Sequence, residues 1–157
     1  MPRGLRVVRG HGSIAPPRWM GAALYAAAAD NLLWGAFIVL QPQALFRWTA
    51  TPVPNYPGLW QCVGLMVGAL GVGYWAAARE PLTHWPLVLV GLLTDVLGGL
   101  GLVGASVRGE LPWEFSLPLA VSALVWGPPF AVILIRAHQR RAASLRTTDD
   151  RRTLRRA

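Results

Sequence analysis

Four apolar runs constrain this chain more than any other feature. They cover residues 19–40, 59–78, 85–107 and 117–135, and an α-helix needs about 20 such residues to cross a ~30 Å hydrocarbon core. Asp30 and Asp95 are the only formally charged side chains within the runs. The runs also lack the polar stripe that a helix of a soluble bundle presents to water. We therefore expect an all-α fold, a bundle of four transmembrane helices.

The rest of the chain divides at the ends of these runs. Of the 157 residues, 1–18 form a basic N-terminal segment, 19–135 the membrane domain and 136–157 an arginine-rich tail. Residues 44–48, between prolines of the longest connection, are predicted to form a short turn at the membrane boundary. Pro128 and Pro129 predict a kink in the fourth helix. Thr148, followed by two aspartates, predicts the start of a short cytoplasmic tail helix.

The arginines predict the orientation of the chain. Of the 15 basic residues, all but Arg47 and Arg108 lie in the two tails or in the 79–84 connection. Short segments rich in arginine stay in the cytoplasm, so both termini are expected there. Tryptophan prefers the headgroup zone, while Trp34 and Trp126 lie deeper. The tryptophans at predicted helix ends, expected to anchor the boundary, are Trp19, Trp48, Trp60, Trp75, Trp85 and Trp113.

The net charge of +8 suggests an anionic partner. Nucleic acid is excluded as the main partner because the charge is split between two tails beside the membrane, where anionic lipid accounts for such clusters. Every basic residue is arginine, which reflects either a genome rich in G and C or docking onto carboxylates of another protein. The arginines expected to contact lipid or a partner are Arg136, Arg140, Arg141, Arg146, Arg151, Arg152, Arg155 and Arg156.

Two acids halfway along their helices suggest a polar layer in the membrane interior. Asp30 and Asp95 share one depth because the first and third helices run in the same direction. Asn31, Thr94 and Ser122 are expected to join them. Small residues on the same helices would let the backbones approach closely, and the glycines expected at these helix contacts are Gly64, Gly68, Gly71, Gly91 and Gly98.

The polar layer has two interpretations. The runs contain no arginine, lysine or histidine to neutralise the acids, so we expect them to be protonated or to share a proton. A neutral acid can then hold the bundle together through a hydrogen bond between helices. Alternatively, the acids mark a proton-coupled path, as acids inside membranes often do. A transporter would usually add broken helices and repeated halves, of which this chain offers only the expected kink.

Other chemistry finds little support in the sequence. His11, His84 and His138 lie outside the membrane interior, so neither haem nor pigment binding is expected inside the bundle. Cys62 is the single cysteine, so no internal disulfide can form. We expect no catalytic residues, no metal site and no cofactor, and hence no enzyme.

Several segments resemble a bacterial family of small four-helix membrane proteins. They are NLLWG at 31–35, PNYPGLWQCVG at 54–64, AAAREP at 76–81, HWP at 84–86 and VLVGLL at 88–93. The resemblance implies a multi-pass protein of the bacterial inner membrane with no established activity. Some members carry a peroxide-reductase label, which the lone Cys62 does not support. A basic residue of the family is replaced here in the Thr94–Asp95 region, so no acid–base pair is implied.

These observations favour an accessory subunit over a carrier. A non-enzymatic chain with glycine-lined helices and basic tails suits packing against a larger membrane complex, such as a respiratory or photosynthetic assembly. The alternative is a small proton-linked transporter that uses Asp30 and Asp95.

Overall fold

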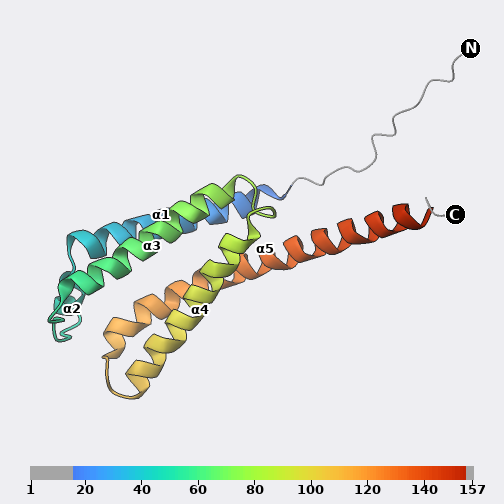
Figure 1. The fold of residues 1–157 in the computed structure, drawn as a ribbon. Helices are drawn as coiled ribbons and strands as arrows, with labels where there is room; N and C mark the ends of the chain where they lie inside the picture. The colour runs from blue at the N-terminus through green and yellow to red at the C-terminus, as the bar shows by residue number, and fades with distance from the viewer. Residues whose placement is uncertain (1–15, 155–157) are drawn as a thin grey trace, which may run out of the picture.

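The structure, a computed structural model, describes the backbone of residues 16–154 and the side chains of residues 16–146. The described part of the chain is built from helices joined by short connections (Figure 1). They are α1 (Arg18–Leu40), α2 (Ala44–Trp48), α3 (Pro57–Ala78), α4 (Trp85–Val107) and α5 (Trp113–Leu154).

The expected all-α architecture is confirmed. The described residues include four helices long and apolar enough to cross a membrane, namely α1, α3, α4 and most of α5. The bounds of α4 agree with the prediction, and α1 begins one residue earlier than expected. Helix α3 begins at Pro57, where a proline in the first turn loses no helical hydrogen bond. The predicted turn at 44–48 is present as α2.

The predicted bounds of the last helix are wrong. Helix α5 begins at Trp113 rather than at residue 117, and it continues without interruption to Leu154. Residues 148–154 are therefore the end of α5, and no separate tail helix begins at Thr148. Pro118, Pro128 and Pro129 all lie inside this helix. The kink at the proline pair stays a prediction. Residues 1–15, Arg155 and Arg156 lie outside the described part.

The long helices form two antiparallel hairpins, α1 with α3 and α4 with α5 (Figure 1). Helices α1 and α3 approach so closely that a Cβ atom built on Gly35 would lie 2.7 Å from the Gly64 carbonyl oxygen and 2.8 Å from the Gly68 nitrogen. Farther along the same interface, a Cβ atom built on Gly71 would lie 3.0 Å from the Ala28 carbonyl oxygen, and one built on Gly21 would lie 2.8 Å from that of Ala78. This hairpin is thus joined backbone to backbone.

Two clusters of buried side chains join one hairpin to the other. The first lies toward the end of the bundle that holds Arg18 and Trp85, and includes Met20, Leu24, Tyr74, Val88, Phe130 and Ile133. The second lies at the opposite end, where Leu45 and Phe46 of α2 pack with Phe115 of α5, and Trp60 and Leu102 pack against them. Because these clusters lie at the two ends of the bundle, they join the hairpins on either side of its middle.

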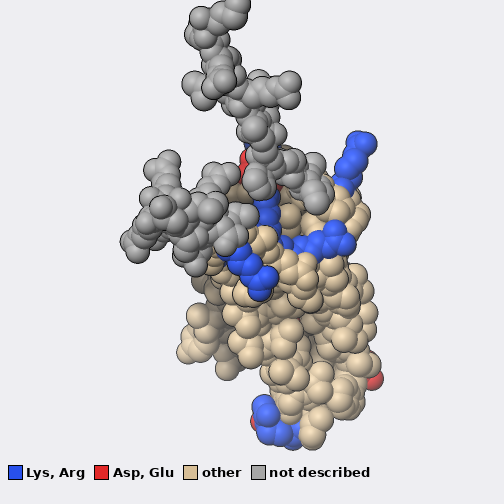
Figure 2. Space-filling view, turned by 90° about the vertical axis from the view of Figure 1, so that its right-hand side faces the viewer, with Lys and Arg blue, Asp and Glu red and all other residues tan. Residues whose placement is uncertain are grey.

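The surface between the two ends is apolar. Figure 2 shows arginines at both ends of the molecule and a broad face between them with few charged side chains. Large hydrophobic side chains are exposed on every long helix, and a smaller share of α4 and α5 than of α1 and α3 is buried. Such a surface is typical of helices surrounded by lipid. The four apolar helices are therefore compatible with a multi-pass membrane protein.

Candidate functional site: an acid-lined cavity between the hairpins

The five residues predicted to form a polar layer line one cavity. Its volume is about 320 Å³, and all four long helices contribute to its wall. The polar residues are Asp30, Asn31, Thr94, Asp95 and Ser122. The apolar wall includes Trp34, Ile38, Trp60, Val63, Val67, Leu102 and Leu119. The cavity lies between the two buried clusters, so it occupies the middle of the bundle.

Asp30 is half-buried and has a partner on the other hairpin. Its Oδ2 atom accepts a 3.0 Å hydrogen bond from Nε1 of Trp126 on α5. Only the depth of Trp126 within the fourth apolar run signals this role in the sequence. An indole at the membrane boundary finds water for its N–H, whereas one in the interior needs a protein acceptor. The bond fixes one carboxylate oxygen of Asp30 at the edge of the cavity.

Two further polar side chains direct their donors to the backbone. Nδ2 of Asn31 donates to the Ala27 carbonyl at 3.0 Å, and the Thr94 hydroxyl donates to the Val90 carbonyl at 2.9 Å. Both are bonds to the residue four positions earlier in the same helix, which satisfies the donor locally. The oxygen atoms of both side chains keep the capacity to accept hydrogen bonds.

Neither acid of the cavity forms an ion pair within residues 16–146. The salt bridge in that region joins Arg108 and Glu110, at 2.6 Å, in the connection between α4 and α5. There the hydrogen bond from the Arg108 guanidinium lowers the pKa of the Glu110 carboxyl. Asp95 has neither a cation nor a hydrogen-bond donor of this kind beside it, which leaves both of its oxygen atoms able to accept.

Four of the five predicted packing glycines lie at contacts between helices, and one does not. Gly64 and Gly71 are buried against α1, and the backbone of Gly68 lies beneath Gly35. Gly91 lies beneath the ring of Tyr74, whose hydroxyl occupies the space of a side chain. The expectation for Gly98 is wrong, because no atom lies within 4 Å of a Cβ built there and the residue lines the cavity. Gly98 therefore adds space to the site.

Tyr74 is a deeply buried polar side chain near the site. It is 1% exposed, and its hydroxyl has no hydrogen-bond partner among the described residues. Its ring meets that of Phe130 edge to face, with the centroids 5.0 Å apart. Tyr74 thus packs where α3, α4 and α5 meet, and it lines a neighbouring pocket that shares Val63, Val67 and Thr94 with the cavity.

Three aromatic rings pack together at the opposite end of the bundle. Phe46 lies 5.4 Å from Trp60 and 5.2 Å from Phe115, measured between ring centroids. Trp60 and Phe115 are 6.0 Å apart, and Trp60 also lines the cavity. This cluster brings α2, α3 and α5 together, so α2 covers the end of the bundle opposite Arg18 and Trp85.

The other predicted boundary residues lie on the surface or near it. Trp19, Trp48, Trp75 and Trp113 are exposed, while Trp60 and Trp85 are partly buried. The Arg141 guanidinium lies 5.0 Å above the Trp85 ring, a cation–π contact between α5 and α4. Cys62 is exposed rather than enclosed by neighbouring side chains. The described side chains of the tail, including Arg136, Arg140 and Arg146, are also exposed.

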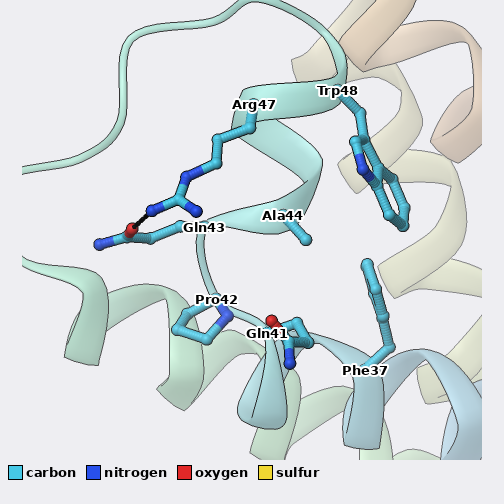
Figure 3. Close-up of a pocket in the computed structure, with 7 residues that line it drawn as sticks. All are labelled: Phe37, Gln41, Pro42, Gln43, Ala44, Arg47 and Trp48. Carbon is cyan, nitrogen blue, oxygen red and sulfur yellow. Dashed lines mark hydrogen bonds between the residues drawn. The ribbon is translucent and has the colours of Figure 1, made fainter.

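A second pocket lies beside α2, with a volume of about 420 Å³. Figure 3 shows Arg47 and Gln43 on one side of Ala44 and the rings of Phe37 and Trp48 on the other. Arg47 donates a 2.6 Å hydrogen bond to Oε1 of Gln43, and the two rings are stacked 5.3 Å apart. Arg47 is the single charged residue that lines this pocket. The cavity with Asp30 and Asp95 gathers more polar groups and is the stronger candidate.

No protein-family model matches the chain, and no curated protein or solved structure matches it significantly.

Proposed function

We propose that this chain is a small carrier in which Asp30 and Asp95 bind a solute in exchange for protons. The supporting observation is the convergence of five polar side chains on one cavity in the middle of four apolar helices. Acids inside a membrane are costly and usually serve a site or a pathway. A purely structural acid needs a hydrogen-bond partner and no open space, whereas Asp95 faces open space without such a partner.

The architecture supports the same proposal. The two hairpins line the cavity, and a small cluster of side chains separates it from each end of the bundle. Rocking of one hairpin against the other would open one cluster while the other stays packed, as carriers do around a fixed site. A kink at Pro128 and Pro129 would give α5 the freedom to bend. We place both termini in the cytoplasm of a bacterial cell, following the arginine distribution.

Reconstitution tests the carrier. Proteoliposomes containing a pH-sensitive dye are given an outward or inward gradient of choline, inositol or lactate. The wild-type chain is expected to move protons with at least one of these solutes, and Asp95→Asn to lower the rate about tenfold, because the amide no longer exchanges a proton. The control is Glu114→Gln, an acid in the first turn of α5 that does not line the cavity. Equal rates for wild type and Asp95→Asn would contradict the proposal.

A second candidate is the accessory subunit favoured by the sequence, and the shape of α5 supports it. The 42-residue helix continues past the ends of the other helices (Figure 1) and carries exposed arginines there. An isolated helical segment is marginal in water, so a partner or a membrane surface would stabilise it. Its arginines suit carboxylates of another subunit or anionic lipid headgroups.

Truncation tests this second candidate. A chain that ends at Arg141 keeps the contact between Arg141 and Trp85 but loses the remaining helix. After purification in mild detergent, the full chain is expected to bring companion proteins that the truncated chain loses. The measurement is identification of the co-purified proteins by mass spectrometry. A full chain that purifies alone, or companions that persist after truncation, would count against docking through α5.

A further inference from the structure

We infer that the ligand of the cavity is a small organic ammonium ion with an apolar body. The inference rests on the proposed carrier function and names its substrate class. Four features of the site carry it: the hydrogen-bonding groups left over after the internal bonds are counted, the uncompensated charge, the apolar wall and the size.

The two carboxylates make the cavity rich in hydrogen-bond acceptors, beside the donors that Ser122 and the second N–H of Asn31 retain. The Trp126 indole donates its N–H to the Asp30 carboxylate. The Asn31 amide donates to the Ala27 carbonyl, and the Thr94 hydroxyl donates to the Val90 carbonyl. Carboxylate oxygens of Asp30 and Asp95, the Asn31 carbonyl oxygen and the Thr94 oxygen remain able to accept. A ligand that satisfies them must donate several hydrogen bonds. A primary ammonium group carries three N–H donors and no acceptor, so it complements this set.

The charge of the site favours the same ligand. Asp30 on α1 and Asp95 on α4 both face the cavity, while α3 and α5 contribute no charged side chain to it. The Tyr74 hydroxyl of α3 is the other titratable group that interacts with Asp95. An unpaired charge in the membrane interior is unfavourable. Either a proton or a bound cation relieves it, which makes the two competitors for one site.

The apolar wall and the volume of the cavity indicate the nature of the rest of the ligand. Trp34, Trp60, Val63, Val67, Leu102 and Leu119 line the cavity. Indole faces attract an ammonium group, and aliphatic side chains suit an apolar body. The volume of about 320 Å³ is at the lower end for small-molecule sites. Gly98 adds open space beside Asp95. A compact amine with one ring fits these limits.

The test compares three ligands of nearly equal size and different charge. The full chain in lipid nanodiscs is titrated by calorimetry with phenethylammonium, 2-phenylethanol and phenylacetate, and empty nanodiscs give the background. Phenethylammonium is expected to bind at least about tenfold more tightly than either of the others. Its affinity is expected to fall as the pH is lowered, because protons then occupy the carboxylates. This pH series uses the unaltered chain and does not depend on the folding of a variant.

Variants locate the binding site. Asp95→Asn removes the charge with little change of shape, and Gly98→Leu fills the cavity while leaving both acids in place. Each is expected to weaken phenethylammonium binding at least about tenfold, whereas Glu114→Gln leaves it unchanged. Gel filtration of each variant serves as the control that it is folded and monodisperse.

Three outcomes would overturn the inference: no saturable binding of phenethylammonium, equal or tighter binding of 2-phenylethanol or phenylacetate, or affinity that neither Asp95→Asn nor Gly98→Leu changes. Such a result does not contradict the carrier proposal if choline, inositol or lactate still drives Asp95-dependent proton movement. If that movement is also absent, the carrier proposal fails with it.

Discussion

Replacing Gly35 with alanine is expected to lower the free energy of unfolding by about 2–3 kcal/mol, a typical cost of overpacking. The new methyl group would overlap the Gly64 carbonyl oxygen and the Gly68 nitrogen at 2.7 and 2.8 Å. Both are backbone atoms of α3, which cannot rotate away as a side chain can. Helices α1 and α3 would have to separate along the hairpin. Thermal unfolding of the purified chain in one detergent, followed by circular dichroism, measures the effect.

Gly68→Ala is the matched control for this prediction. Gly68 belongs to the same interface, yet no atom lies within 4 Å of a Cβ built on it. Alanine is the better helix former by about 0.5–1 kcal/mol, so this variant should be as stable as the wild type or slightly more so. If Gly35→Ala and Gly68→Ala unfold at the same temperature, the hairpin is not joined through its backbones as described.

The sequence predicts the long apolar helices well because lipid, as a solvent, leaves an apolar run few other structures. An apolar run of about 20 residues has few alternatives to a helix across lipid, and α1, α3 and α4 agree with their predicted bounds to within two residues. The same reasoning fails for α5 because an apolar run marks the part of a helix in lipid and not its end. Past Ile135 the chain is rich in arginine and alanine, good helix formers in water, so the helix continues through Thr148.

The cavity could be predicted in part. Equal depth along two parallel helices was enough to group Asp30 with Asp95, since each helix advances by a fixed rise per residue. The bond from Trp126 to Asp30 joins residues 96 positions apart, and no local pattern predicts which faces of α1 and α5 meet. Gly91 and Gly98 share one face of α4 by spacing, yet Tyr74 covers the first and open space lies beside the second. Only the packing of the hairpins separates these roles.

Gly91→Ala is expected to destabilise the contact between the hairpins by about 2 kcal/mol, again through overpacking. A Cβ atom at this position would overlap the Tyr74 hydroxyl and lie 2.6 Å from two ring atoms. The ring cannot easily move aside, because Tyr74 is 1% exposed and packs edge to face on Phe130. Helix α4 would be pushed from α3 at one of the few places where the two hairpins touch. Thermal unfolding in detergent measures the loss, with Gly98→Ala as the control on the same helix.

A double-mutant cycle with Tyr74→Leu assigns this effect to the ring. Leucine removes the atoms that oppose the new methyl group, so adding Gly91→Ala to Tyr74→Leu should cost less than adding it to the wild type, with a coupling of about 1 kcal/mol. If the two costs are equal, the alanine acts through the helix itself and not through Tyr74. Because the buried Tyr74 hydroxyl has no partner, burial of that polar group is itself unfavourable. The close contact with Gly91 therefore stabilises the bundle through the packing of the ring.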